Sequence, residues 1–147
     1  MKTSCLFLLL AALAFGESRQ ILVISHRGEH LKHPENTLPA YLAAIGLGAD
    51  CIEVDVRTTG DGRLVCMHNS SVDATTDGKG QVSALTFEQI RALDAGVKFA
   101  PHFAGTRVPS FEEVLAAVRG RVGIYVDAKS VSAAHLIKAL EEFEMLE

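Results

Sequence analysis

The chain has 147 residues and a formal net charge of -4 at pH 7, and 48% of its residues are hydrophobic. This mild acidity argues against the basic surface that nucleic-acid binding needs, and it gives no charge attraction to an anionic membrane. Aromatic residues make up 6% and tryptophan is absent, which argues against a stacking platform for single-stranded nucleic acid. The apolar fraction is ample for a globular core.

Residues 1–16 have the pattern of an export signal. Lys2 provides a positive start, residues 5–15 form an apolar core, and Ala14-Phe15-Gly16 fits a small-x-small cleavage site. The apolar stretch is shorter than the ~20 residues that a membrane-spanning helix needs. We therefore expect cleavage after Gly16, an exported (secreted or periplasmic) mature chain and no stable membrane insertion; a retained anchor is the alternative.

Short apolar runs alternate with stretches of helical periodicity in the rest of the chain. The runs are rich in Val, Ile and Leu and are bounded by Gly, Asp or Ser, as buried parallel strands are. In chain order the pattern predicts a strand at 21–25, a helix at 38–47, strands at 51–56 and 64–67, helices at 86–93 and 111–118, a strand at 122–126 and a helix at 132–143. This alternation predicts an α/β fold with a parallel sheet.

Three of the predicted helices have recognisable N-termini. Thr37 is a candidate N-cap for the first helix. Thr86 with Gln89, and Ser110 with Glu113, have the S/T-x-x-E/Q spacing of a capping box. These signals support the predicted starts.

Two connections depart from a regular strand–helix alternation. Residues 57–63 join the second and third strands and contain Gly60-Asp61-Gly62, so the link is too short for a helix. These strands are then either antiparallel or parallel through an extended link. Residues 69–121 form a long excursion, and because long loops in compact domains are usually functional, we expect it to cover the catalytic face.

Charged side chains gather at the predicted strand ends. Glu53 and Asp55 share one face of their strand, while the apolar residues between them face the other way. Two carboxylates on an interior face repel unless a cation lies between them, and a hard divalent ion is their natural partner. Asp127, in the fourth strand region, can complete a three-carboxylate site.

Two histidines and two cationic residues complete this set. His26 and His68 each follow a strand, and imidazole suits both the acid and the base that phosphodiester cleavage requires. Arg27 offers a planar fork for phosphate oxygens, and Lys129 can neutralise phosphate charge. Each residue alone has an ordinary structural explanation, but the joint placement at four strand ends favours a metal-dependent phosphodiesterase.

Two cysteines, Cys51 and Cys66, remain after residue 16. Each lies two residues before a candidate site residue, so strand alternation predicts that both thiols face the same way as the site. A disulfide is feasible if neighbouring strands bring the α-carbons within ~4.4–6.8 Å. Buried free thiols are the favoured interpretation, and the absence of a CxxC pair argues against a cysteine metal site.

A series of motifs extends over residues 21–129. It consists of His26-Arg27-Gly28, Pro34-Glu35-Asn36-Thr37, Gly48-Ala49-Asp50, Ile52-Glu53-Val54-Asp55-Val56, Thr58, Asp61-Gly62, His68, residues 73–80, Leu93-Asp94-Ala95-Gly96, Gly105 and Pro109. In this order the motifs resemble the glycerophosphodiester phosphodiesterase family. The resemblance implies a TIM (β/α)8-type barrel, of which the first half (about four strands) is present, and hydrolysis of glycerophosphodiesters to glycerol 3-phosphate and an alcohol.

The resemblance also implies a role for each candidate residue. These roles are catalysis by His26 and His68, binding of a divalent metal ion (Ca2+ or Mg2+) by Glu53, Asp55 and Asp127, and contact with the substrate phosphate by Arg27 and Lys129. Glu35 is expected to brace the first loop, with a contact near the metal as the alternative. Three positions depart from the family: Asn69 stands where Asp is usual, Ala74 where Arg is common, and Asp127 where Glu is more frequent.

A whole barrel of this type takes ~250 residues, whereas residues 17–147 provide about four strands. We expect a partial barrel domain with open edge strands and an uncovered apolar face. Either the chain is a piece of a longer barrel, which we favour, or two half-barrels associate. In the first case substrate contacts from the remaining strands are missing, and inactivity of the isolated chain is one expected outcome.

Two other functions fit parts of the pattern. A sphingomyelinase D-like phospholipase D shares a barrel with two histidines and a Glu/Asp/Asp metal site, and it releases a cyclic phosphate. An exported, non-catalytic module that binds phosphate or a head group is the other alternative, and Asn69, Asp127 and the short length are its support. The product, glycerol 3-phosphate or a cyclic phosphate, distinguishes the first alternative. The second is distinguished by whether His26→Ala or His68→Ala removes turnover while leaving metal binding intact.

Overall fold

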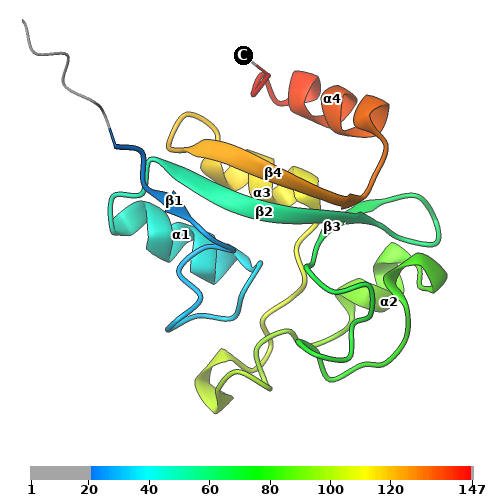
Figure 1. The fold of residues 1–147 in the computed structure, drawn as a ribbon. Helices are drawn as coiled ribbons and strands as arrows, with labels where there is room; N and C mark the ends of the chain where they lie inside the picture. The colour runs from blue at the N-terminus through cyan, green and yellow to red at the C-terminus, as the bar shows by residue number, and fades with distance from the viewer. Residues whose placement is uncertain (1–20, 147) are drawn as a thin grey trace, which may run out of the picture.

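The sheet of the computed structural model, which describes residues 21–146, is built around one central strand. The strands are β1 (Ile24–Ser25), β2 (Cys51–Thr58), β3 (Leu64–Cys66) and β4 (Gly123–Ser130). β2 pairs in parallel with β1 and β4 and antiparallel with β3. Because β4 pairs along nearly all of β2, β1 and β3 must share the other edge of β2 (Figure 1).

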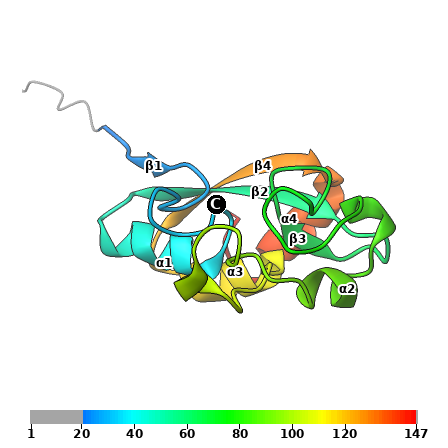
Figure 2. The same cartoon turned by 90° about the horizontal axis from the view of Figure 1, so that it is seen from below.

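The helices are α1 (Leu38–Gly46), α2 (Phe87–Arg91), α3 (Phe111–Val118) and α4 (Ala133–Glu142), with short 3-10 helices at Val82–Ala84 and Pro101–Phe103. Figures 1 and 2 show α1 and α3 on the same face of the sheet. Both predicted capping boxes are confirmed, at Thr86 and at Ser110. Thr37 is the N-cap residue of α1, as predicted, but it forms no side-chain capping bond, because its hydroxyl donates to the Pro34 carbonyl at 2.6 Å.

The alternation predicted for β2 is confirmed. Ile52, Val54 and Val56 are fully buried in the main core with apolar residues of α1, α3 and α4. Glu53 and Asp55 therefore face away from these helices. A second, smaller apolar cluster lies beyond β3 and contains residues of the long excursion, among them Val72, Ile90 and Val108.

Three sequence-based expectations need correction. β2 and β3 are antiparallel, so the alternative of a parallel link is wrong. β4 continues to Ser130, four residues beyond the predicted end, so Asp127 and Lys129 lie within the strand. Cys66 is paired with Val56 and packs in the main core on the helix side, so its thiol does not face the same way as Glu53.

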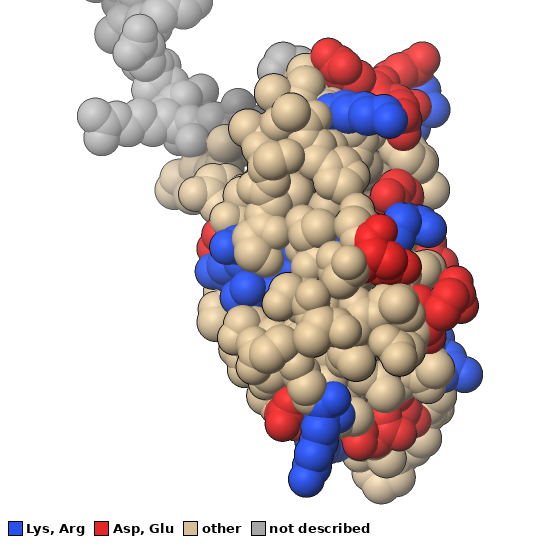
Figure 3. Space-filling model, turned by 90° about the vertical axis from the view of Figure 1, so that its right-hand side faces the viewer, with Lys and Arg blue, Asp and Glu red and all other residues tan. Residues whose placement is uncertain are grey.

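Both cysteines in the described part of the chain are free, as the favoured interpretation predicted, but only Cys66 of the two is buried and Cys51 is partly exposed. The predicted signal at residues 1–16 lies outside the described residues. Among residues 21–146, no helix has the length and apolar character needed to cross a membrane. On the face shown in Figure 3, acidic and basic side chains are interspersed around a largely uncharged centre.

Candidate active site

Three carboxylates from two neighbouring strands converge on the face of the sheet that points away from the helices. β2 provides Glu53 and Asp55, and the register places Asp127 of β4 directly beside Asp55. One oxygen of each carboxylate lies within 4.8 Å of the others. Glu53 is 6% exposed and Asp55 is fully buried, so their mutual repulsion is poorly screened by water.

Two cationic side chains offset part of this charge. The Arg27 Nε lies 3.3 Å from the Asp55 Oδ2, and the Lys129 Nζ lies 3.3 Å from the Asp55 Oδ1. Lys129 also donates a hydrogen bond to the Asp127 Oδ2 at 2.6 Å, and this bond raises the pKa of the Lys129 ammonium. The structure thus brings Arg27 and Lys129 into the carboxylate cluster.

The cluster offers a divalent cation oxygen ligands and negative charge that Arg27 and Lys129 offset only in part. The buried Asp55 Oδ1 accepts no well-oriented hydrogen bond in the described part of the chain, and its charged neighbour there is the Lys129 ammonium at 3.3 Å. The Glu53 Oε2 accepts a hydrogen bond from the Arg27 backbone N–H at 2.8 Å, but burial raises the pKa of Glu53, and the charge of Asp55 adds to this shift. Three carboxylates with free oxygens are the ligands that a hard divalent ion prefers.

Asn36 ties the first loop, residues 26–37, to this cluster. Its side-chain amide donates to the Asp55 Oδ2 at 2.8 Å, and its Oδ1 accepts from the Asp55 backbone N–H at 3.2 Å. The same Oδ1 accepts from the Tyr41 hydroxyl of α1 at 2.8 Å. All three residues are buried. Sequence reasoning missed both Asn36 and Tyr41; only the motif Pro34-Glu35-Asn36-Thr37 marked the position.

His68 is held from both its ring and its backbone. The His68 Nδ1 donates to the Asn69 Oδ1 at 2.8 Å, since an amide oxygen can only accept. Asn69 therefore orients this ring although it lacks the charge of the usual Asp. Arg57 donates from Nε and Nη2 to the His68 carbonyl at 3.0 and 2.5 Å. Sequence reasoning missed Arg57, although it continues the alternation of Glu53 and Asp55.

His26 is exposed where β1 ends and is adjacent to Arg27 in the chain. Its ring meets the His30 ring edge-on, with ring centroids 5.4 Å apart. The His30 Nδ1 donates to the His26 carbonyl at 2.7 Å. The first loop thus holds His26 through its backbone, and its ring nitrogens stay accessible.

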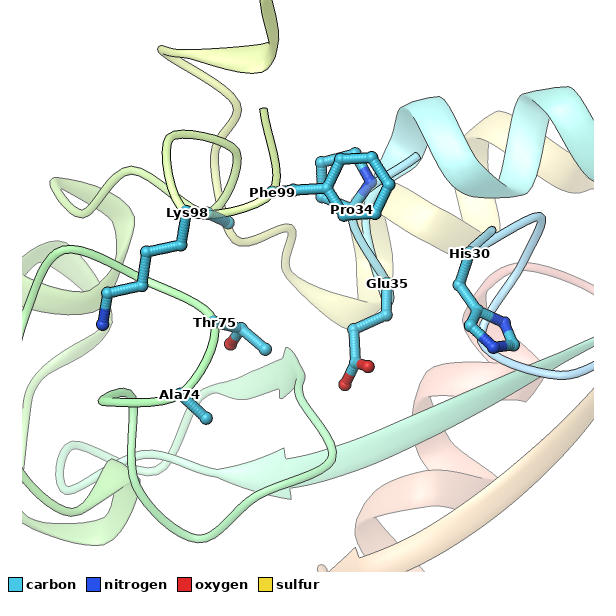
Figure 4. Close-up of a pocket in the computed structure, with 8 residues that line it drawn as sticks. His30, Pro34, Glu35, Ala74, Thr75, Lys98 and Phe99 are labelled. Atoms are coloured by element: carbon cyan, nitrogen blue, oxygen red, sulfur yellow. The ribbon is translucent and has the colours of Figure 1, made fainter. Parts of the chain in front are cut away.

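Glu35 braces the first loop, as expected. Both of its oxygens lie 3.2 Å from the Arg27 Nη1. Glu35 also lines a cleft together with residues of the long excursion, among them Thr75 and Phe99 (Figure 4). The excursion therefore lies over the part of the structure next to the carboxylate cluster.

Comparison with known proteins shows consistent similarity. Residues 26–146 match the glycerophosphoryl diester phosphodiesterase family. A glycerophosphodiester phosphodiesterase of Caldanaerobacter subterraneus is 43% identical over 133 residues, which cover 86% of this chain and 55% of that protein. Human glycerophosphodiester phosphodiesterase 1 is 38% identical over 130 residues, covering 86% of this chain and 38% of its own.

Solved structures of similar proteins have the same fold over the part that this chain covers. The glycerophosphodiester phosphodiesterase of Agrobacterium tumefaciens superposes with a TM-score of 0.84 at 37% identity, covering 86% of this chain and 55% of that chain. A phosphodiesterase of Oleispira antarctica, solved with the product sn-glycerol-3-phosphate, gives a TM-score of 0.80 at 27% identity, with 84% and 53% coverage. The chain thus spans about half the length of the Caldanaerobacter protein.

Proposed function

The chain belongs to the glycerophosphoryl diester phosphodiesterase family and forms part of its TIM barrel, and we propose that it takes part in metal-dependent hydrolysis of glycerophosphodiesters to glycerol 3-phosphate and an alcohol. The observation that carries this proposal is the convergence of three carboxylates, within 4.8 Å of one another, beside Arg27 and Lys129. This arrangement combines a cation site with phosphate-binding side chains. The product named for the Oleispira structure belongs to the same chemistry.

Glu53, Asp55 and Asp127 would hold the divalent ion, and Ca2+ and Mg2+ are the candidates because both prefer oxygen ligands. When bound, such an ion neutralises charge on phosphate oxygens and lowers the pKa of a bound water. Arg27 and Lys129 are already held among these carboxylates, so they need little reordering to contact a phosphate. Arg27 supplies a planar pair of donors and Lys129 a point charge.

His26 and His68 are the proposed acid and base. With its Nδ1–H hydrogen-bonded to the Asn69 Oδ1, His68 keeps a lone pair on Nε2 that can accept a proton from the attacking oxygen. His26 would then give a proton to the leaving alcohol. In the alternative assignment His26 is the base and His68 is the acid. In either case one histidine takes a proton from the attacking water while the other gives a proton to the leaving alcohol, and proton exchange with solvent restores both.

The test is the release of glycerol 3-phosphate from glycerophosphoglycerol and glycerophosphocholine by the purified chain, with Ca2+ or Mg2+ present. We expect that EDTA abolishes release, and that His26→Ala and His68→Ala abolish release but still bind metal. His135→Ala on α4 is the matched control, because His135 is partly exposed and belongs neither to the carboxylate cluster nor to the cleft beside Glu35.

Other products or behaviour would contradict the proposal. Formation of a cyclic phosphate would indicate a sphingomyelinase D-like reaction. Substrate binding without turnover would indicate a phosphate- or head-group-binding module if it persists when the remaining barrel strands of a relative are joined to this chain, because a partial barrel can be inactive through missing substrate contacts. Export is proposed from residues 1–16 alone, and N-terminal sequencing of the mature protein, with Glu17 expected as the first residue, tests it.

A further inference from the structure

A cleft of about 180 Å³ separates the first loop, residues 26–37, from the loops of the long excursion. In Figure 4 the Glu35 carboxylate points into this cleft from one side, and Thr75 approaches it from the other. Phe99 and Pro34 both line the cleft and give it an apolar part (Figure 4). The cleft therefore combines hydrogen-bonding groups with an apolar surface.

The cleft is connected to the proposed catalytic residues. A narrower hollow shares Glu35 and Thr75 with it and extends to His68. On another side, Glu35 accepts hydrogen bonds from Arg27, whose Nε lies 3.3 Å from Asp55. A phosphate held by Arg27 would thus have one ester group directed at the cleft.

The lining indicates the chemistry of that group. The Glu35 oxygens accept from a single Arg27 nitrogen, which leaves lone pairs for further donors. The Thr75 hydroxyl can both donate and accept, and it is half-exposed. A small alcohol with several hydroxyls meets these groups, and its C–H faces fit against Phe99.

The same lining disfavours other alcohols. A quaternary ammonium group is recognised by the faces of aromatic rings, and Phe99 is the single Phe, Tyr or Trp that lines the cleft. Lys98 adds a positive charge to the lining, although its ammonium is turned away from Glu35 and donates to the Asp73 carbonyl. The volume of about 180 Å³ also leaves little room for two acyl chains.

We propose that this cleft binds the leaving alcohol of the substrate and selects small hydroxyl-rich alcohols, such as glycerol, over choline. The proposal rests on the phosphodiesterase function proposed above. Thr75 is its specificity-determining residue, because its hydroxyl contacts the alcohol and not the phosphate or the metal ligands. Glu35 contributes an acceptor but also holds Arg27, so Thr75 is the cleaner position to change.

The experiment compares glycerophosphoglycerol with glycerophosphocholine for the wild type, Thr75→Val and the control Thr58→Val. Thr58 is a half-buried threonine of β2 and does not line the cleft. We expect a higher kcat/KM for glycerophosphoglycerol, and Thr75→Val should lower it about five-fold, the usual effect of one lost hydrogen bond, with glycerophosphocholine unaffected. Calorimetric affinities of both diesters in a His68→Ala background provide a readout that does not need turnover.

The outcomes separate this proposal from the one on which it rests. If Thr75→Val weakens both diesters equally, the cleft holds their common glycerol phosphate part, and the proposal is overturned. Turnover of both diesters without preference, and without any effect of Thr75→Val, overturns it while leaving the phosphodiesterase function intact. A Thr75-dependent binding preference supports the cleft even if the wild-type chain turns over neither diester; lack of turnover that persists when the remaining barrel strands are supplied contradicts the phosphodiesterase function alone.

Discussion

The side chain of Asn36 binds both the carboxylate and the backbone of Asp55. Its Nδ2 lies 2.8 Å from the Asp55 Oδ2, and its Oδ1 lies 3.2 Å from the Asp55 backbone nitrogen. An amide suits this position because it offers a donor and an acceptor in one rigid plane. Asn36 also has a φ of 55°, a left-handed conformation that asparagine tolerates better than most residues.

We expect Asn36→Asp to weaken metal binding by about 10- to 100-fold, the range for residues that orient metal ligands. The new carboxylate would replace the N–H donor and place a second negative charge against the buried Asp55. Titration with Ca2+ or Tb3+ measures the affinity. Tyr41→Phe removes one of the bonds to Asn36 and should give a smaller loss. Equal metal affinity in wild type and Asn36→Asp would show that Asn36 does not position Asp55.

Asp127→Asn should remove the metal-dependent stabilisation of the fold. A ligand that binds only the folded state adds about 2.7 kcal/mol at one hundred times its Kd. Asp127 is one of three carboxylates that converge, and its replacement by an amide removes a charge. Thermal melting with and without Mg2+ or Ca2+ should show a shift in wild type and little shift in the variant. Asp127→Glu keeps the charge and should retain most of the shift.

The stability contribution of Asp94 should depend on pH. Its carboxylate accepts hydrogen bonds from the backbone N–H groups of Gly105 at 2.6 Å, Gly96 at 2.8 Å and Val97 at 3.0 Å. These bonds, that from Gly105 most strongly, lower the pKa of Asp94 below 3.8. A carboxyl group whose pKa is lower in the folded than in the unfolded state stabilises the fold at pH values above its unfolded pKa. This contribution is lost as the pH falls through its folded-state pKa.

Asp94→Asn should therefore melt below wild type at pH 6 to 8, and the gap should narrow progressively below about pH 4, as expected for an aspartate pKa. Melting curves followed by circular dichroism across this pH range measure the gap. A gap of the same size at every pH would mean that the charge of Asp94 contributes nothing to the effect.

Cys66 should resist alkylation in the folded protein. It is 2% exposed, and burial raises the pKa of its thiol well above the usual value. Because the thiolate is the reactive species, iodoacetamide at pH 8 should modify Cys66 roughly tenfold or more slowly than the partly exposed Cys51. Mass spectrometry of both peptides follows the rates. Guanidinium should equalise them, and equal rates under native conditions would contradict the packing of Cys66.

The open edge of β4 predicts self-association of this chain. The structure describes one neighbour for β4, which is β2, and Ile24 of β1 and Tyr125 of β4 are both exposed. Unpaired edges with exposed apolar residues pair readily with other chains. Light scattering should detect dimers or larger species, and Tyr125→Lys should shift them towards monomer. A cooperatively melting monomer at all concentrations would contradict this expectation.

Sequence reasoning located most of the secondary structure because the relevant signals are local. Phe111–Val118 was predicted with its observed bounds, since a capping box marks its start and its apolar residues recur with helical spacing. The ends of strands were less accurate. β4 is longer than its apolar run because pairing with β2 continues past Val126, through Asp127 to Ser130.

The sequence by itself determined the barrel-type order of elements, the shared face of Glu53 and Asp55, and the family to which the motifs belong. These follow from side-chain alternation along one strand and from motif spacing. The site roles assigned to these residues stay predictions until the experiments above are done. Only the tertiary structure decided which residues surround them.

Asn36 reaches Asp55 across 19 positions of sequence, and Arg57 reaches the His68 carbonyl across a hairpin. Neither contact has a local pattern, because a hydrogen bond between loop and strand depends on how the chain returns and not on neighbouring residues. The antiparallel course of β3 is another such outcome, since Gly60-Asp61-Gly62 permits both directions. Packing selected the course that places Cys66 in the main core with Val56.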